Sequence, residues 1–427
     1  MRRSEHRGSM AALRLTRYTT LVVAAALWFL AKFVRYAFPP LFETFQASYG
    51  LSTATVGLVY TGLMTVYALL QFPSGMLSDR FGPVRVVTGG ALVAAVGSFA
   101  LVADSPAPVF VAAAMLVGAG TGAHKTVAVR VLSRVYPSRT GRVLGVFDTV
   151  GAYGGVGASA VVTLFLVAPP VLTPFVSRLP GAAWRGVFLL AGLAGVALAA
   201  AFAWYVPRQL SSSDDADAAA TAESADPTLA DYLRQFSDRR FAAFILVTVL
   251  FSFSYNGAVA FLPLYLTDAV GFETTTANLL YSLLFALSVV QVVTGDVSDR
   301  TGRLPIITVT LGIAGVSLVG AVVLADGGFL ALGAAVVGLA VGSHGFRPVR
   351  GVYLVEILPD WIAAGGLGIV RTILMGAGAV SPAVVGFLAE AYDLRAAFAL
   401  LAASMVGAAV VAGGLLLSER TGGAEPA

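Results

Sequence analysis

Two lysines stand out among the basic residues, because both fall inside long apolar stretches. Only Lys32 and Lys125 are lysine among 27 basic residues. Lys32 is followed by Arg35 and Tyr36 at the spacing i, i+3, i+4, which places the three side chains on one face of a helix. A cationic face of this kind is suited to binding an anion through charge-assisted hydrogen bonds.

Other polar side chains interrupt apolar stretches further along the chain. A histidine lies close to a basic residue at His124 and again at His344, and Tyr255 precedes Asn256. A Lys or Arg at the centre of a membrane helix costs about 2.5–3.5 kcal/mol, so we expect such side chains to face a wet cavity or a partner. We predict a site for a small anion formed by the following residues: Lys32, Arg35, Tyr36, His124, Lys125, Tyr255, Asn256, His344 and Arg347.

Two other interpretations of these residues stay open. Lys125, Arg347 and especially Arg350 fall near one end of their predicted helices and could extend to the membrane surface. The two histidines could bond neighbouring backbone. Lys32 and Arg35 are harder to explain in these ways, because helix 1 must continue past them to cross a core of about 30 Å.

The composition indicates a membrane protein. Hydrophobic residues make up 58% of the 427 residues, charged residues 12%, and the mean hydropathy is +0.85, whereas soluble domains carry about 25% charged residues. The length accommodates about twelve helices with their loops. With no cysteine, disulfide scaffolds, thiol enzymes and iron–sulfur carriers are excluded, and we expect neither a metal nor a cofactor.

Apolar runs recur along the whole sequence, and basic residues cluster in alternate loops. The positive-inside rule therefore places both termini in the cytoplasm, and we expect a multi-pass protein of the plasma membrane. The net charge of +4 fits these loops and does not point to nucleic acid. We predict membrane helices at 18–38, 53–73, 86–103, 108–130, 142–168, 184–206, 241–266, 274–295, 304–325, 328–350, 363–388 and 393–417.

A polar segment divides the chain into two halves. Residues 207–240 are rich in serine, alanine and aspartate and are typical of a cytoplasmic linker. We expect six-helix bundles at 1–206 and 241–427. The proline-rich stretch 168–180 is expected to be an outer loop.

The two halves share a motif at an offset of 220 residues. Internal duplication of this kind is typical of secondary transporters. No nucleotide-binding loop of the Gly-x-x-x-x-Gly-Lys-Ser/Thr kind occurs, so ATP is not expected to drive the protein directly. The residues shared by the two copies are Gly75, Ser78, Asp79, Arg80 and Gly82 in the first half and Gly295, Ser298, Asp299, Arg300 and Gly302 in the second.

This motif resembles the signature loop of the major facilitator superfamily, and the resemblance covers the chain from helix 1 to helix 12. It implies an all-α fold of twelve helices in two pseudo-symmetric bundles, with helices 1, 4, 7 and 10 lining a central cavity. It also implies that the motif loops form a breakable latch between the halves. Asp148, expected to pair with Arg130 or Arg134, would belong to the same inner gate.

Finer resemblances are mixed. Arg35 together with the run from Tyr67 through Gln71 to Gly75 is similar to organic-anion and organophosphate branches of the superfamily. The helix-4 motif lacks its usual arginine, since Ala114 occupies that region. Helix 5 lacks the Gly-Pro pair of drug antiporters, and helices 2 and 8 lack the arginines of nitrate porters.

These observations predict a secondary transporter, not an enzyme, that moves a small solute across the cell membrane by alternating access, and we expect this solute to be an organic or inorganic anion. We expect a monomer in the lipid bilayer, with a proton or a counter-anion as the coupling partner and no nucleic acid. Two alternatives remain: a multidrug or general exporter with an apolar cavity, and a transporter-like sensor that binds a ligand without moving it.

Overall fold

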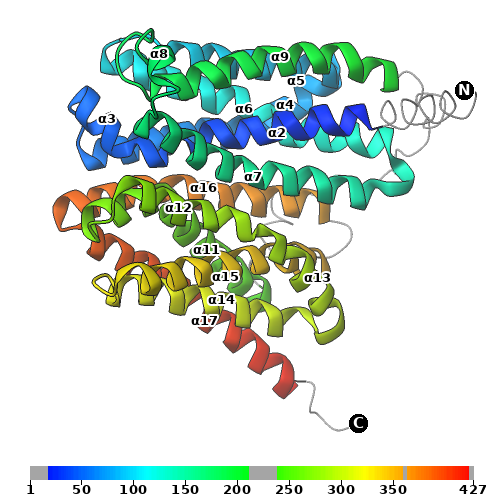
Figure 1. Ribbon diagram of the computed structural model, residues 1–427. Coiled ribbons are helices and arrows are strands. Elements are labelled where there is room, and N and C mark those ends of the chain that lie inside the picture. Colours follow the sequence, from blue (N-terminus) through cyan, green and yellow to red (C-terminus); the bar gives the residue numbers. More distant parts are fainter. Residues whose placement is uncertain (1–17, 211–237, 359–362, 423–427) are drawn as a thin grey trace, which may run out of the picture. The chain divides into compact units, whose positions relative to one another are not determined.

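The computed structural model describes residues 18–210, 238–358 and 363–422, and these residues form helices joined by short turns (Figure 1). Three of the expected features, the basic amino terminus, most of the 207–240 linker and the extreme carboxyl terminus, lie outside these ranges. The helices are α2 (Thr19–Tyr36), α3 (Phe42–Tyr49), α4 (Thr53–Phe81), α5 (Pro83–Ala100), α6 (Ala107–Val135), α7 (Thr140–Val167), α8 (Thr173–Val176), α9 (Arg185–Leu210), α11 (Arg239–Leu264), α12 (Thr274–Ala286), α13 (Val290–Thr301), α14 (Arg303–Val323), α15 (Gly328–Ile357), α16 (Ala363–Ala391) and α17 (Leu394–Gly422), with short 3-10 or π turns at Pro39–Leu41, Pro137–Arg139, Tyr265–Ala269 and Leu287–Val289.

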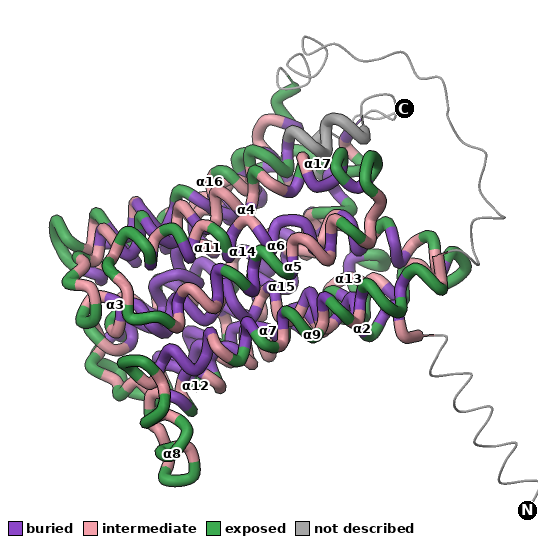
Figure 2. The backbone as a smooth tube through the Cα atoms, turned by 90° about the horizontal axis from the view of Figure 1, so that it is seen from above, coloured by how far each residue is buried: buried purple, intermediate pink, exposed green. Residues whose placement is uncertain are grey.

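Twelve helical spans within the described residues are long and apolar enough to cross a membrane, which confirms the predicted number. Their surfaces fit this environment. Large apolar side chains such as Phe72, Val292 and Val316 are exposed on the spans, as expected for side chains that meet lipid instead of water. The segment around α8 is mostly exposed (Figure 2), in agreement with an expected loop at 168–180.

The prediction that the two motifs form loops is wrong in one respect, because most of each motif is helical. The helix expected at 53–73 continues as α4 to Phe81, and α13 continues to Thr301. Only Gly82 and Gly302 break the helices, with φ of 84° and 93°, a region that side chains with a Cβ rarely enter. A single glycine therefore makes each turn, and Pro83 or Arg303 begins the next helix.

Two compact units divide the chain, and the first consists of Met1–Ala37 and Val66–Ala220. Within its described part, α5 packs on α6 and α9, and α2 packs on α7 and α9 (Figure 1). Aromatic side chains reinforce the contact of α2 with α7, where the rings of Trp28 and Phe147 stack at 6.0 Å. A core of small and branched apolar residues fills the remaining space.

The second unit, Phe38–Thr65 and Thr221–Ala427, repeats this packing with the second-half helices. Here α14 packs on α15 and α17, and α11 packs on α16 and α17. At the start of α11, the Asp238 carboxylate accepts the backbone N–H groups of Arg240 and Phe241 at 2.7 and 3.0 Å, a helix N-cap. The matching contacts in both units are the structural counterpart of the sequence duplication.

One segment of the first half belongs to the second unit by its contacts. Phe38–Thr65, which holds α3 and the beginning of α4, groups with the second-half helices. The Phe42 ring meets that of Phe261 edge-on at 5.2 Å. The bundle boundaries expected at 206 and 241 stay a prediction, since this grouping follows contacts and not the order of the chain.

Both halves also share an ion pair that the sequence motifs did not reveal. Arg185, at the start of α9, bonds Asp104 at 2.6 Å, and Arg395, near the start of α17, bonds Asp326 at 2.7 Å. Each pair joins the last helix of its half to the turn between the third and fourth helices. The pairs therefore stabilise equivalent corners of the two repeats.

Candidate functional site

The indole of Trp28 is surrounded by cations in the first unit. Lys32 Nζ lies 5.1 Å, Arg35 Cζ 5.4 Å and Lys125 Nζ 5.7 Å from the ring centroid. Trp28 is 2% exposed, and such cation–π contacts contribute about 0.5–2 kcal/mol each. We call Trp28, Lys32, Arg35 and Lys125 the Trp28 cluster; it joins α2 and α6.

Arg35 is the most enclosed cation of the Trp28 cluster. Its side chain is 3% exposed, its Cζ lies 3.6 Å from the ring centroid of Tyr67, and its Nε donates to the Ala31 carbonyl at 3.0 Å. Within residues 18–210, 238–358 and 363–422, no carboxylate forms an ion pair with Arg35. An aromatic ring shields this charge without neutralising it.

Lys125 does have an acidic partner. Its Nζ lies 3.0 and 3.3 Å from the two carboxylate oxygens of Asp148 on α7. The prediction that Asp148 pairs with Arg130 or Arg134 is therefore wrong. The three cations of the Trp28 cluster and this one carboxylate leave a net charge of +2.

Glycines on α7 allow this helix to approach the Trp28 cluster closely. A Cβ placed on Gly154 would lie 3.0 Å from the Cβ of Lys32 and 3.0 Å from the backbone N of Phe33. A Cβ on Gly151 would overlap the indole of Trp28. The glycine-rich sequence of helix 5 thus seats Trp28 and Lys32 against α7.

The second unit has its own set of polar and aromatic side chains on α11 and α15. Arg347 Cζ lies 4.8 Å from the ring centroid of Tyr255, and the imidazole of His344 meets the same ring edge-on at 6.1 Å. Asn256 Nδ2 donates to the Ser252 carbonyl at 2.8 Å. The predicted residues Tyr255, His344 and Arg347 therefore lie together.

Both histidines contact backbone oxygens, the simpler of the two interpretations left open by the sequence. A ring nitrogen of His124 lies 3.4 Å from the Thr121 carbonyl, and Nε2 of His344 lies 2.8 Å from the Leu284 carbonyl. Tyr36 is partly exposed on α2. Of the predicted residues in the first unit, Lys32, Arg35 and Lys125 share Trp28, which the sequence prediction missed.

The first signature motif forms an ion pair with helix α6. Arg130 Nη1 donates to Asp79 at 2.8 Å, while Arg80 lies over the ring of Phe81. The side chains of Arg130 and Asp79 are both more than half exposed. Gly75, like Gly295 in the second motif, is helical, and a Cβ there would meet no atom within 4 Å.

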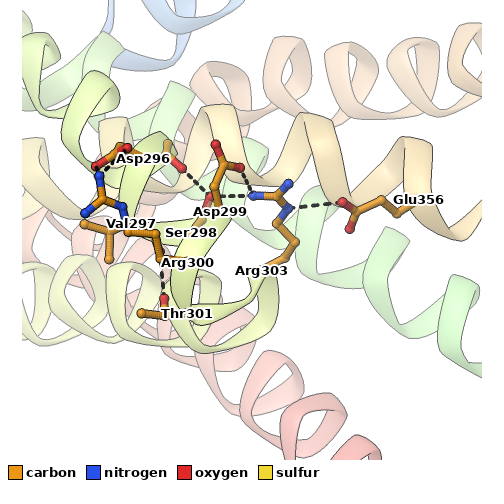
Figure 3. Close-up of polar contacts among 9 residues, drawn as sticks. Asp296, Val297, Ser298, Asp299, Arg300, Thr301, Arg303 and Glu356 are labelled. Carbon is orange, nitrogen blue, oxygen red and sulfur yellow. Dashed lines mark hydrogen bonds and ion pairs between the residues drawn. The ribbon is translucent and has the colours of Figure 1, made fainter.

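The second motif forms a larger network (Figure 3). Arg303 lies between Asp299 and Glu356, bonds both carboxylates, and reaches Glu356 at 3.1 Å. Arg300 pairs with Asp296 one turn earlier at 2.9 Å. The sequence prediction had Asp299 and Arg300 here but missed Arg303 and Glu356.

Two hydrogen bonds away from the motifs join α4 to α16 in the second unit. Thr61 Oγ1 on α4 accepts the backbone N–H of Ala383 at 2.9 Å, and Glu390 on α16 accepts the N–H of Ala54 at 2.9 Å. Glu390 thereby caps the start of α4. The helix predicted at 363–388 ends two residues before Glu390, and an acid directly after an apolar run was the sequence signal that could have identified it.

Residues 24–344 match the family model described as Major Facilitator Superfamily. A Haemophilus influenzae protein named as a metabolite transport protein is 25% identical, covering 81% of both chains. A Cupriavidus necator protein named as a sulfoacetate transporter is 25% identical over 89% of both, and an Arabidopsis thaliana chloroplastic protein named as an anion transporter is 26% identical over 80% of this chain and 67% of its own.

Solved structures with this fold include a bacterial homologue of the human lysosomal transporter Spinster in an inward-facing, unoccupied conformation. The TM-score is 0.73 at 16% identity, with 95% of this chain and 97% of the other covered. A D-xylose–proton symporter aligns with a TM-score of 0.69 at 18% identity, covering 92% and 97%. The family and the similar proteins are transporters, which confirms the expectation that the chain is not an enzyme.

Proposed function

Because the chain belongs to the Major Facilitator Superfamily and is a secondary transporter, we propose that its cargo is a small anion. The single observation that carries this proposal is Arg35, an enclosed cation that forms no ion pair with any residue that the structure describes. A charge in this position is costly unless a counter-charge approaches it. The cargo supplies that counter-charge.

The Trp28 cluster supports the choice of an organic anion. Arg35 and Lys32 provide positive charge, and Trp28 and Tyr67 provide aromatic faces. A guanidinium binds a carboxylate, sulfonate or phosphonate through two parallel hydrogen bonds. Among similar proteins, the names that refer to sulfoacetate and to anions are consistent with such a cargo.

The remaining residues are assigned to alternating access. We assign the Asp79–Arg130 pair and the network around Arg303 to a latch at the cytoplasmic end, where the positive-inside rule places the basic loops. Lys125 and Asp148 hold α6 to α7 beside the cargo. The protein resides in the plasma membrane as a monomer and couples cargo movement to a proton or to a counter-anion.

Uptake into proteoliposomes tests the cargo class. Labelled sulfoacetate is presented to the full-length protein, with sulfate, choline and mannitol as unlabelled competitors. We expect uptake that anions inhibit and that Arg35→Gln reduces about tenfold or more, since lost hydrogen bonds to a charged group cost about 1.5–3 kcal/mol. Arg142→Gln, which removes an equal charge from an exposed position on α7, should retain uptake.

The same assay separates the alternatives. A general exporter with an apolar cavity would move neutral or cationic solutes equally well and would tolerate Arg35→Gln. A sensor would bind the anion without flux. Either result would contradict the proposal.

A further inference from the structure

The two repeats treat one conserved arginine position differently. At the 220-residue offset, Arg350 corresponds to Arg130 and Asp299 to Asp79. In the first repeat the corresponding residues form an ion pair at 2.8 Å. In the second repeat Asp299 bonds Arg303 instead.

Arg303 is the reason for this difference. Its counterpart in the first repeat is Pro83, and the counterpart of Glu356 is Tyr136, so the first repeat lacks both members of the Arg303–Glu356 pair. Arg303 therefore bonds Asp299, the counterpart of the carboxylate that pairs with Arg130 in the first repeat (Figure 3). Arg350 on α15 therefore does not pair with Asp299.

Among the residues that the structure describes, no acidic side chain forms an ion pair with Arg350. Its Cζ lies 6.0 Å from the ring centroid of Phe251 and 5.7 Å from that of Phe346. Its Nε is buried and has no hydrogen-bond partner in the described ranges. The charged groups that act on it are Arg347 and Arg371, both cationic.

The positive charges of Arg347 and Arg350 are not balanced by an ion pair. In the part of the chain that the structure describes, neither Arg347 nor Arg350 forms an ion pair. Burying a guanidinium nitrogen without an acceptor costs about 1–3 kcal/mol or more, and the neighbouring cations repel one another. An anion with several oxygen atoms would accept a hydrogen bond from the buried nitrogen and would offset the repulsion between the cations.

We propose that Arg350 and Arg347 form an oxyanion-binding site of the second unit, separate from the Trp28 cluster. The guanidinium groups select a carboxylate, sulfonate or phosphonate. The rings of Phe251, Phe346 and Tyr255 beside them select a ligand whose oxyanion is attached to an apolar body. The ligand class is thus a small aromatic or aliphatic organic oxyanion.

Calorimetric titration of benzenesulfonate into the full-length protein in phosphatidylcholine nanodiscs tests this site. A Lys32→Gln/Arg35→Gln background removes two of the three cations of the Trp28 cluster and leaves Lys125 in its ion pair with Asp148. In that background we expect benzenesulfonate still to bind. Adding Arg350→Gln should weaken binding about tenfold or more, Arg350→Lys should weaken it less, and Arg142→Gln should leave it unchanged.

Each other outcome overturns the inference. Equal affinity with and without Arg350→Gln, or no binding in the double-variant background, would exclude the site. If phosphatidylglycerol in the nanodiscs abolishes the Arg350-dependent binding, the site holds a lipid headgroup and not a soluble ligand. Thermal melting of each variant excludes loss of fold as the cause.

The outcome is independent of the proposed function. Sulfoacetate uptake that tolerates Arg35→Gln would remove the case for the Trp28 cluster but would leave an Arg350-dependent binding signal intact. Conversely, uptake that requires Arg35 beside unchanged binding in Arg350→Gln would overturn only the present inference.

Discussion

Arg35 is 3% exposed, and its guanidinium lies against the ring of Tyr67. Its charge is therefore kept away from bulk water. The neighbouring Lys125 differs, since Asp148 bonds it at 3.0 Å. The Trp28 cluster therefore combines one neutralised cation with an excess of positive charge. We expect the affinity for an anion to rise as the net positive charge of the Trp28 cluster rises.

Removing the carboxylate of Asp148 tests the balance. Asp148→Asn raises the net charge of the four ionisable side chains from +2 to +3, so we expect the affinity for sulfoacetate to rise a few-fold. Lys125→Gln should lower it by a similar factor. Both are measured as inhibition constants in the uptake assay.

The double variant provides the control. Lys125→Gln/Asp148→Asn restores the net charge of +2 and should return the affinity close to that of the parent. The Lys125–Asp148 pair is 32% and 52% exposed, so its loss should cost only about 0.2–1 kcal/mol of stability. An affinity that falls in Asp148→Asn would show that the carboxylate acts other than through charge.

Part of this site was predictable from the sequence. The i, i+3 spacing placed Lys32 and Arg35 on one face, and both now meet Trp28. Trp28 was not predicted, because an aromatic residue in an apolar run has the pattern of ordinary core. Tyr67 was named with Arg35 in the resemblance to organic-anion branches, but its contact with Arg35 was not predicted. The partner of Asp148 was predicted wrongly, since partner choice depends on the rotation of α6 against α7.

At the scale of elements, single glycines set where two long helices end. Gly82 stops α4 with φ of 84°, and Gly302 stops α13 with φ of 93°. The sequence predicted the turns but placed them too early, because the polar residues before each glycine look like a loop. In the structure the polar residues of each motif lie on the last turns of their helices.

The backbone of Gly82 makes a specific prediction. Gly82→Ala forces a Cβ into a region that L residues avoid, so we expect a loss of about 1–3 kcal/mol in the free energy of unfolding. Gly89→Ala, inside α5 with open space around the Cβ, should instead gain up to about 1 kcal/mol. Thermal melting in detergent measures both, and equal shifts in the two variants would contradict this account of the turn.

At the scale of the whole molecule, alternating access requires that a contact be made and broken. We propose that one such contact lies in the second unit, where α4 meets α16 through Thr61 and Glu390. The two helices approach closely enough that a Cβ on Gly57 would lie 2.5 Å from the Pro382 carbonyl oxygen. Only glycine allows this approach.

A large side chain at Gly57 should hold this end apart. We expect Gly57→Leu to lengthen the distance between spin labels at Ser48→Cys and Tyr392→Cys, measured by double electron–electron resonance. The chain contains no cysteine of its own, so the two labels are specific. A Cβ on Gly312 would meet no atom within 4 Å, so Gly312→Leu should leave the distances unchanged. A Gly57→Leu distribution that matches the parent would contradict the role of this contact.

The duplication was the most predictable feature of the whole chain. The repeated motif predicted two related halves, and the helix contacts of the two units correspond. The asymmetry between Arg130 and Arg350 was not predictable, because it depends on Arg303 reaching Asp299 and Glu356 in space. Sequence repeats predict the helix packing that the two halves share, whereas the ion pairs that differ between the halves are seen only in the structure.

The most direct test of the anionic cargo compares two solutes of equal shape and different charge. Methanesulfonate is an anion at neutral pH, and methanesulfonamide is its uncharged counterpart. We expect methanesulfonate, and not methanesulfonamide, to inhibit sulfoacetate counterflow in proteoliposomes, with the difference abolished by Lys32→Gln/Arg35→Gln. Equal inhibition by the two solutes in the parent protein would contradict the central claim.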